Sequence, residues 1–458
     1  MHPSEYESVQ LTQQVTPASR TLDESSQRWR RVYRAAGTGI GSHLAAVAVT
    51  IFTTPLILHS LGTGPYGMYL VITQMGALLA FSDFGMSNGL VSPLARAIAA
   101  DQKWLIQELI SSALAVMVAI GLSIGLLLSI LWPMVNWSAA LGAHDSSSAT
   151  QAAPALAIFL ASVLVSLPLR LVEKVQLAYQ EAATFNAWRL VGTTLTLAAT
   201  TACYLLHGTL ALFVAASVTG PIVASALNSV WIMHRRTDTR PRLSSIRNRS
   251  ARSLSQSGTL FLVLAITGAI AYQTDILVLS HVMNATKVTT YGLVLKLFSF
   301  PTLLVSFALL ALWPAFSDSL ANDDIEWVRR SFRRAIRLAA YVNVPAAIIL
   351  LASAKYILDA WVGSASEQPT WLLLYAFAIW TMLNSLNGPI AMLLNGANVV
   401  RFQVVCSVAM AIMNLGLSIW LTKSIGIAGP MLGTIISQTA CYTIPAGIYI
   451  TRRGWFHR

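Results

Sequence analysis

The sequence predicts an all-α integral membrane protein with about twelve transmembrane helices. Apolar stretches of about twenty residues follow one another through almost the whole chain, and each is long enough to cross a hydrocarbon layer of about 30 Å as a helix. Hydrophobic residues make up 55% of the chain and charged residues only 10%, whereas soluble domains carry about 25% charged residues. The stretches do not alternate between apolar and polar residues, so they are not barrel strands.

Short connections separate the predicted spans. The spans are residues 37–60, 66–91, 108–132, 154–176, 184–206, 210–233, 258–281, 288–313, 335–352, 371–394, 403–422 and 427–450. We expect residues 1–34 to be a disordered, polar and basic tail, because they lack an apolar run. Residues 451–458 form a second short tail.

Lys and Arg are concentrated on one side of this topology. They cluster at residues 28–34, 235–252, 329–337 and 452–458, which all fall on the same side if the number of spans is even. The positive-inside rule places that side in the cytoplasm, with both termini. We therefore expect a multi-pass protein of the inner (plasma) membrane. Its net charge of +12 faces anionic membrane lipids rather than nucleic acid, because no basic domain exists outside the spans.

The basic inter-lobe loop, residues 234–257, divides the spans into two sets of six, residues 35–233 and 258–450. Similar dipeptides occur at corresponding places in the two halves. They are Tyr66-Gly67 with Tyr291-Gly292, and Gly220-Pro221 with Gly429-Pro430. These echoes predict two pseudo-symmetric six-helix lobes around a central cavity, an arrangement common in transporters.

Short motifs also occur in order along both halves. They are TPLILHSLG at 54–62, GPYGMY at 64–69, SDFGMSNG at 82–89, TDILVL at 274–279, YGLVLKL at 291–297 and WPAFS at 313–317. Over roughly residues 35–450 the chain resembles the polysaccharide biosynthesis flippases, also called O-antigen or lipid-linked oligosaccharide flippases. These belong to the multidrug/oligosaccharidyl-lipid/polysaccharide exporter superfamily.

The resemblance implies a cavity that opens alternately to each side of the membrane. It implies movement of undecaprenyl-diphosphate-linked oligosaccharide, an O-antigen or exopolysaccharide repeat unit, from the cytoplasmic to the periplasmic leaflet. A monomer working with other polysaccharide assembly proteins is expected, with no cofactor and coupling to an H⁺ or Na⁺ gradient. The residues do not identify the glycan or the coupling ion.

Two other classes of function compete with a flippase. A cation-coupled exporter of small molecules, or of another lipid-linked precursor, would emphasise acidic sites, whereas this chain has more basic than acidic residues inside its spans. An envelope enzyme would need a large outside loop. The outside loops here are short and carry no nucleophile motif, phosphate loop or metal-ligand cluster, so we expect neither an enzyme nor a metal site.

Ionisable residues inside spans are the first candidates for a site, because an unpaired ion in hydrocarbon is costly. Lys296 lies about 12 Å into the eighth span, too deep to reach the interface easily. We expect it to face the cavity and attract the substrate diphosphate; alternatively, it pairs with a carboxylate and holds helices together. Asp275, late in the seventh span, could pair with Lys296 or Lys287, bind a coupling proton, or bond nearby hydroxyls.

A second group lies near the inner ends of the spans. Arg170 and Lys174 share one face of the fourth span, and Arg189 should lie at similar depth on the fifth. Together they could form a phosphate entry site, or merely anchor the helices with Glu173 as partial neutralisation. In the second span, Asp83 and Asn88 are cavity candidates, although Asp83 could equally cap or bend the helix.

Two further elements follow from the pattern. Pro301, central in the eighth span and close to Lys296, is our candidate hinge, the alternative being fixed curvature. Residues 323–337 read as a basic amphipathic helix that begins with a capping box and lies on the inner leaflet.

Overall fold

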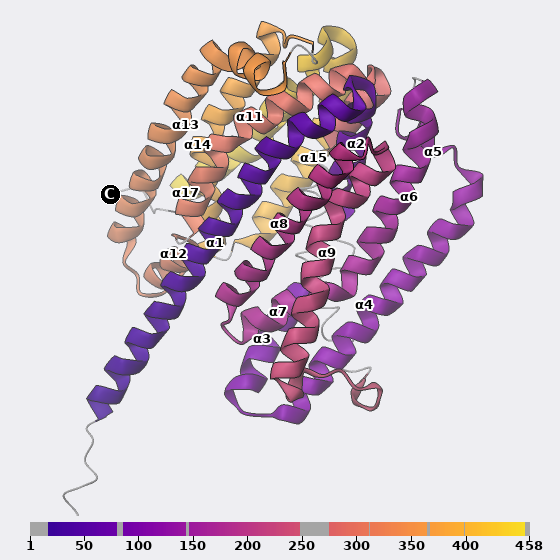
Figure 1. Cartoon of the computed structure of the whole chain (residues 1–458). Helices are drawn as coiled ribbons and strands as arrows, with labels where there is room; N and C mark the ends of the chain where they lie inside the picture. The colour runs from indigo at the N-terminus through magenta and orange to yellow at the C-terminus, as the bar shows by residue number, and fades with distance from the viewer. Residues whose placement is uncertain are drawn as a thin grey trace, which may run out of the picture.

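The computed structural model describes residues 17–79, 86–142, 146–247, 274–310, 312–363, 367–397 and 399–453. Within these ranges the chain is helical and contains no strand (Figure 1). The α-helices are α1 (Pro17–Leu61), α2 (Thr63–Leu79), α3 (Met86–Ala99), α4 (Lys103–Leu131), α5 (Trp137–Ala140), α6 (Ser146–Leu169), α7 (Leu171–Ala178), α8 (Ala182–Leu205), α9 (Leu210–Arg235), α11 (Ala285–Leu310), α12 (Leu312–Ala321), α13 (Ile325–Val362), α14 (Trp371–Gly396), α15 (Val400–Ile425), α16 (Gly429–Gln438) and α17 (Ile444–Arg452). Short helical turns are η1 (Trp132–Met134), η2 (Thr237–Thr239), η3 (Leu243–Ser245), η5 (Gly426–Ala428) and the π-helical η6 (Thr439–Thr443).

These helices confirm the predicted membrane fold. In the part of the chain that the structure describes, eight segments are long and apolar enough to cross a membrane, and one of them, residues 401–452, contains both the eleventh and the twelfth predicted span. The second predicted span appears as α2 and α3, the fifth as α8, and residues 274–281 are the described part of the seventh.

Two helices extend beyond the predicted spans. α1 begins at Pro17, so it includes residues of the tail for which we predicted disorder. No Gly or Pro interrupts residues 18–36, and adding residues to an existing helix needs no new nucleus. α13 contains both the basic segment and the ninth span in one continuous helix. The helix begins where Asp324 caps its first turn by accepting a hydrogen bond from Trp327 N at 3.0 Å. The predicted basic helix is therefore confirmed, but it is continuous with the ninth span, and the basic residues form the first turns of a helix about 57 Å long. Its place on the inner leaflet stays a prediction.

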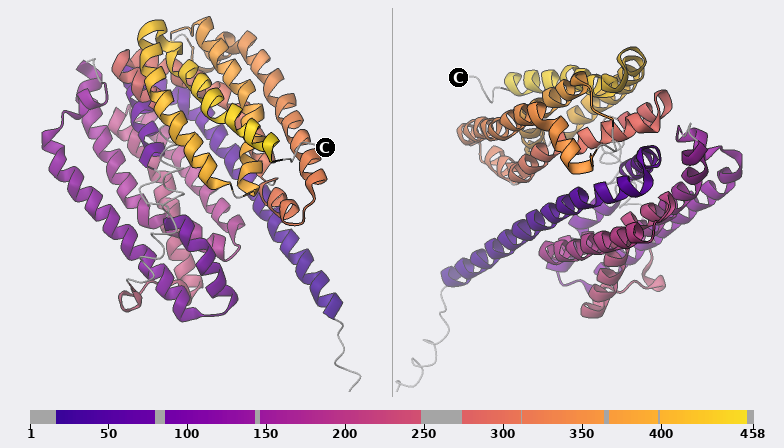
Figure 2. Two further views of the ribbon diagram at one scale, coloured as in Figure 1. Left: turned by 180° about the vertical axis from the view of Figure 1, so that it is seen from behind. Right: turned by 45° about the horizontal axis from the view of Figure 1, so that its top comes forward.

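Each lobe is built from helices that pack side by side. In the N-terminal lobe, α8 packs between α1 and α9, and α6 packs against α9. In the C-terminal lobe, α13 packs against α14, α15 against α16, and α11 against both α13 and α14. The two views of Figure 2 show the helices of each half of the chain grouped together. The described helices therefore group into the two lobes that the repeated dipeptides predicted.

The lobes meet where α1 ends, α2 begins and α11 begins; we call this the closed end. Thr289 Oγ1 of α11 donates a hydrogen bond to Thr63 O at 2.7 Å, and Trp361 Nε1 of α13 donates to Ile51 O of α1 at 2.8 Å. α2 lies beside α11 near the top of Figure 1. The opposite end, which carries residues 235–247 and the start of α13, is called the basic end.

Two glycines allow the lobes to approach this closely. A Cβ at Gly67 of α2 would lie 2.1 Å from the backbone oxygen of Ala285, which opens α11. A Cβ at Gly142 would lie 2.2 Å from the backbone oxygen of Ser280 in the other lobe. Because the opposing atoms belong to the backbone, a side chain at either position would push the lobes apart.

We therefore predict that Gly67→Ala weakens the closed end. The reporter is a cysteine at position 63 in a chain without its native cysteines. With Gly67→Ala, this cysteine should react about tenfold faster with a hydrophilic thiol reagent than it does with Gly67 in place. A tenfold change corresponds to a shift of about 1.4 kcal/mol in the equilibrium between closed and separated lobes. Gly416→Ala on α15 is the control, because a Cβ there would meet open space. Equal reaction rates in the two variants would contradict the prediction.

Candidate functional site

Lys296 connects the two lobes near the closed end. It belongs to α11, and its Nζ donates hydrogen bonds to Thr54 Oγ1 of α1 at 3.0 Å and to Tyr66 OH of α2 at 2.9 Å. The ammonium also lies 5.6 Å from the centroid of the Tyr66 ring. Among the residues that the structure describes, no carboxylate forms an ion pair with Lys296. Lys296 is therefore not paired with a carboxylate among the described residues. The hydrogen-bond partners of its ammonium are the neutral hydroxyls of Thr54 and Tyr66.

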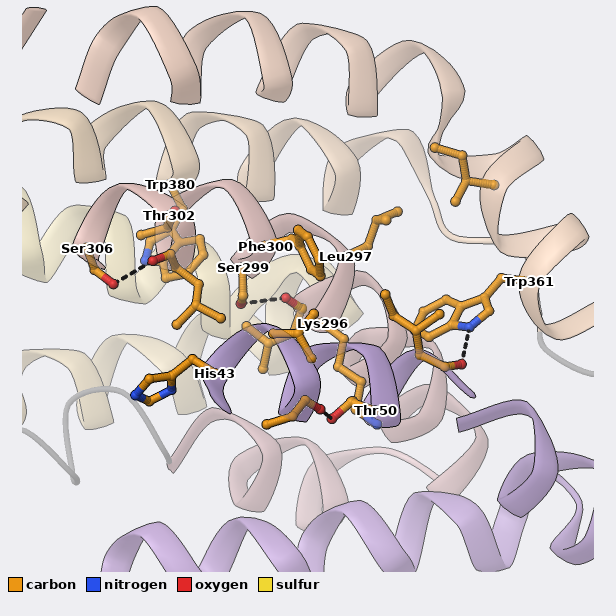
Figure 3. Close-up of a pocket in the computed structure, with 16 residues that line it drawn as sticks. His43, Thr50, Lys296, Leu297, Ser299, Phe300, Thr302, Ser306, Trp361 and Trp380 are labelled. Atoms are coloured by element: carbon orange, nitrogen blue, oxygen red, sulfur yellow. Dashed lines mark hydrogen bonds between the residues drawn. The ribbon is translucent and has the colours of Figure 1, made fainter. Parts of the chain in front are cut away.

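An apolar cavity of about 700 Å³ lies next to Lys296, between α1 of one lobe and α11, α13 and α14 of the other (Figure 3). Most of its lining side chains are aliphatic or aromatic. The full lining is His43, Ala46, Val47, Thr50, Ile51, Leu295, Lys296, Leu297, Ser299, Phe300, Thr302, Leu303, Ser306, Ile357, Trp361 and Trp380. A volume in this range is typical of small-molecule sites, about 300–1,000 Å³.

Two polar atoms in the lining of this cavity are buried and have no hydrogen-bond partner among the residues that the structure describes. They are Thr302 Oγ1 and Trp380 Nε1. Most buried polar side-chain atoms have partners, so each exception calls for an explanation. An indole N–H can only donate and a hydroxyl can donate. Including Lys296, three residues that carry a donor group therefore line one cavity.

Sequence reasoning missed Thr302 and Trp380. One signal was present for the tryptophan: Trp380 lies in the middle of the tenth predicted span, whereas interfacial tryptophans lie at span ends. Thr302 follows Pro301 directly but carries no pattern of its own. Pro301 itself is buried within α11, which continues unbroken through it. Its role as a hinge stays a prediction.

Asp275 lies in a separate, buried cluster within the C-terminal lobe. Its Oδ2 accepts hydrogen bonds from Tyr291 OH at 2.9 Å and from Thr434 Oγ1 at 3.0 Å, and Ser418 Oγ lies 3.4 Å from its Oδ1. Only 6% of Asp275 is exposed. The side-chain oxygen of Asn414 also accepts a hydrogen bond from Ser418 Oγ, at 2.9 Å. The result is a carboxylate surrounded by oxygen atoms from three elements.

Asp275 pairs with neither of the two lysines that the sequence left open as partners. Lys296 bonds the N-terminal lobe, and Lys287 forms an ion pair with Glu367 at the closed end. Asp275 instead faces α15 and α16, where hydroxyl groups satisfy it. Bonding to hydroxyls is observed, although they belong to Tyr291, Ser418 and Thr434, and proton binding stays a prediction.

The structure brings two of the three inner cations together. Arg170, Glu173 and Arg189 line one cavity of about 180 Å³ between α6, α7, α8 and α9. Arg189 also donates a hydrogen bond to Ser42 Oγ of α1 at 2.7 Å. Lys174 pairs with Glu173 at 3.4 Å and is not part of this lining. None of these three cations lines the cavity of Lys296.

The two candidates in the second span cannot be placed in the same way. Asp83 lies outside the described residues, and Asn88 lies in α3 with its side chain outside them.

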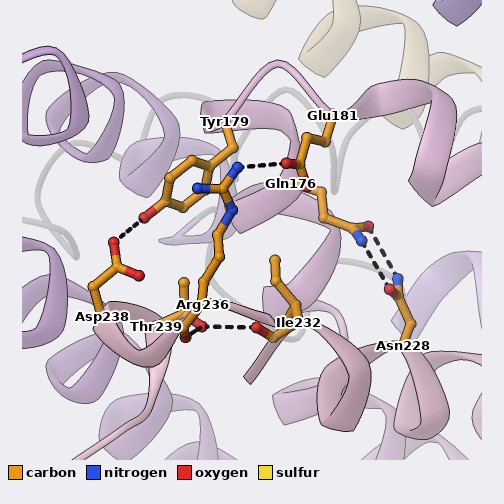
Figure 4. A network of polar contacts seen from close by, with 8 residues as sticks. All are labelled: Gln176, Tyr179, Glu181, Asn228, Ile232, Arg236, Asp238 and Thr239. Carbon is orange, nitrogen blue, oxygen red and sulfur yellow. Dashed lines mark hydrogen bonds and ion pairs between the residues drawn. The ribbon is translucent and has the colours of Figure 1, made fainter. Parts of the chain in front are cut away.

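A polar network holds the basic end of the N-terminal lobe (Figure 4). Arg236 forms an ion pair with Glu181 at 2.6 Å and stacks on Tyr179, with 4.1 Å between the guanidinium carbon and the ring centroid. Tyr179 OH donates to Asp238 Oδ2 at 2.6 Å, and burial together with this carboxylate raises the pKa of Tyr179. Part of the predicted basic loop thus anchors the turn between α7 and α8 to the end of α9.

Comparisons with known proteins agree with this architecture. A family model described as "Polysaccharide biosynthesis protein" matches residues 61–368. A comparison with curated proteins finds no match.

Several solved structures share the fold. An inward-facing multidrug resistance MATE family transporter of the MOP superfamily is 13% identical, with a TM-score of 0.76 over 91% of this chain and 96% of that one. An outward-facing MATE family transporter of the same superfamily is 12% identical, with a TM-score of 0.67 over 93% of this chain and 96% of that one. A MOP superfamily transporter from Pyrococcus furiosus is 12% identical, with a TM-score of 0.62 over 92% of this chain and 94% of that one. The chain thus has the fold of these membrane transporters and belongs to the polysaccharide biosynthesis protein family.

Proposed function

We propose that the chain is a flippase that moves an undecaprenyl-diphosphate-linked oligosaccharide from the cytoplasmic to the periplasmic leaflet of the inner membrane by alternating access. One observation carries the proposal. Lys296, Thr302 and Trp380, each with a donor group, line an apolar cavity that lies between the lobes, and the donors of Thr302 and Trp380 have no partner among the described residues.

The chemistry of this cavity fits a diphosphate attached to a lipid. Phosphate oxygens accept hydrogen bonds and carry negative charge, so they match an ammonium, a hydroxyl and an indole N–H. The apolar walls match the hydrocarbon that is joined to the diphosphate. A cationic small molecule would instead be repelled by the positive charge of Lys296. Membership of a polysaccharide biosynthesis family supports the same class of cargo.

The positions of the lobes support a state that is ready to load cargo. The positive-inside rule places the basic end in the cytoplasm, so the closed end lies on the periplasmic side. The chain also superposes better on an inward-facing MATE transporter than on an outward-facing one, with TM-scores of 0.76 and 0.67. In this account Arg170, Lys174 and Arg189 attract the diphosphate near the cytoplasmic entrance.

Loading and opening are linked through Lys296. The diphosphate competes with Thr54 and Tyr66 for the same ammonium, because both are neutral acceptors and a phosphate is charged. When the Lys296 ammonium binds the cargo instead, two hydrogen bonds between the lobes at the closed end are lost. The lobes then rock, with Pro301 as the hinge of α11, and the cargo leaves on the periplasmic side.

Asp275 is the coupling group in this proposal. It is buried without a basic partner among the described residues, and oxygen atoms of Tyr291, Ser418 and Thr434 surround it. A carboxylate in such a site can take up a proton, or hold Na⁺ with the neighbouring oxygens as further ligands. Binding of either cation neutralises the buried charge and drives the return of the emptied lobes.

The first prediction concerns Lys296. In proteoliposomes, Lys296→Ala should lower flipping of a fluorescent undecaprenyl-diphosphate oligosaccharide by at least about a hundredfold, because a charge-assisted contact and the lobe latch are both lost. The neutral undecaprenol-linked oligosaccharide should not move even with the unmodified chain. Lys355→Ala is the matched control, since Lys355 lies 4.4 Å from the Trp371 ring and does not line the cavity.

Full activity of folded Lys296→Ala would remove this residue from the site. If the unmodified chain moves neither lipid, the flippase proposal fails and a small-molecule exporter becomes the better account.

The second prediction concerns coupling. Asp275→Asn keeps the shape of the side chain and removes its charge, so an imposed H⁺ or Na⁺ gradient should no longer accelerate flipping. The matched control is Asp359→Asn, an exposed carboxylate on α13 that bonds Gln368. The assay is the initial flipping rate at several values of pH and Na⁺ concentration. The same gradient dependence in both variants would return Asp275 to a structural role.

A further inference from the structure

A second cavity, in the N-terminal lobe, has a different chemistry from the cavity at Lys296. It lies between α6 and α9 and has a volume of about 340 Å³, within the range of small-molecule sites. Its polar lining is four serines and one arginine, and no acidic residue is part of it. These residues are Ser162, Ser166, Ser217, Ser225 and Arg170.

The serine hydroxyl hydrogens are already used inside the helices. Ser162 Oγ donates to Phe159 O at 2.6 Å, Ser166 Oγ to Val163 O at 2.7 Å, and Ser217 Oγ to Val214 O at 2.7 Å. A hydroxyl that donates its one hydrogen to the backbone keeps only its lone pairs for a ligand. Three of the four serines can therefore accept hydrogen bonds from a ligand but cannot donate to it.

This pattern selects between the two parts of a lipid-linked oligosaccharide. Diphosphate oxygens only accept hydrogen bonds, so acceptor oxygens in the wall repel them. Sugar hydroxyls carry hydrogens and can donate to each serine. Arg170 lines this cavity and also the neighbouring one with Arg189, so it can attract the diphosphate at the entrance and donate to sugar oxygens here once the diphosphate has reached Lys296.

The cavity lies near the site of Lys296. Ser217 lies beside Tyr69 of α2, the Tyr69 ring stacks on the Tyr66 ring with 5.8 Å between centroids, and Tyr66 OH bonds Lys296. α2 in turn packs against α11 of the other lobe. The cavity and Lys296 thus contact the same pair of stacked tyrosine rings of α2, one on each side of the pair.

We propose that the cavity between α6 and α9 binds the first sugars of the cargo through their hydroxyl groups. Recognition of the glycan is then separate from recognition of the diphosphate. Ser166 and Ser217, on facing helices, accept from sugar hydroxyls, and the ring of Phe159 offers an apolar surface to the sugar. This inference rests on the proposed function for the nature of the cargo.

The experiment measures binding to the full chain in lipid nanodiscs. The probes are undecaprenyl diphosphate alone and undecaprenyl diphosphate carrying one hexose, one N-acetylhexosamine or one hexuronic acid. We expect the unmodified chain to bind at least one sugar-bearing lipid more tightly than the bare lipid. Ser166→Ala combined with Ser217→Ala should lower that affinity ratio by about tenfold or more, since each hydrogen bond lost is worth about threefold to tenfold.

Ser229→Ala is the matched control. Ser229 lies on α9, its hydroxyl also donates to the backbone of its own helix, and it does not line the cavity. Its affinity ratio should equal that of the unmodified chain. The inference is overturned if no sugar raises the affinity, or if the double serine variant, shown to be folded by its retention of the unmodified thermal transition, keeps the unmodified ratio.

The two proposals fail in different ways. Lys296→Ala should weaken binding of the bare and the sugar-bearing lipids by the same factor. If it weakens neither, the diphosphate site of the proposed function fails, while the ratio between sugar-bearing and bare lipid still reports on the serine cavity.

Discussion

The ammonium of half-buried Lys296, at the meeting point of the lobes, makes the interaction on which the rest of the structure depends. Lys296 reaches from α11 to hydroxyl groups on α1 and α2, at the end where Gly67 and Gly142 let the backbones approach. A carboxylate partner would hold a buried charge so firmly that removing it would be costly. Neutral hydroxyls satisfy the ammonium but leave its charge available to an anion that enters the cavity.

The same constraint explains how the polar residues are distributed. The buried carboxylate Asp275 and the ammonium Lys296 are kept apart, each among hydroxyl groups, so neither neutralises the other. Donors without partners among the described residues, Thr302 and Trp380, accompany the ammonium, whereas acceptor serines line the cavity of the N-terminal lobe. In our proposal, anion recognition, cation coupling and glycan recognition belong to three places, which alternating movement of the two lobes can link.

Much of the fold could be predicted from the sequence, because bilayer thickness and the need to satisfy backbone groups leave few choices for a chain of repeated apolar stretches. Lys296 could be singled out as an isolated charge deep in a span. Its partners could not, because Thr54 and Tyr66 lie more than two hundred positions away and depend on how the lobes dock. That Asp275 pairs with neither lysine could not be predicted for the same reason, and Trp380 and Thr302 stand out only once their burial is known.

The most direct test of this account is the distance between spin labels at positions 59 and 281, which are exposed near the closed end on opposite lobes. It would be measured in nanodiscs with and without undecaprenyl-diphosphate oligosaccharide. The account predicts that cargo releases Lys296 from Thr54 and Tyr66, so a population with a longer distance should appear, and the neutral undecaprenol-linked oligosaccharide should not produce it. An unchanged distance distribution with saturating, bound cargo would contradict the claim that the diphosphate unlocks the lobes.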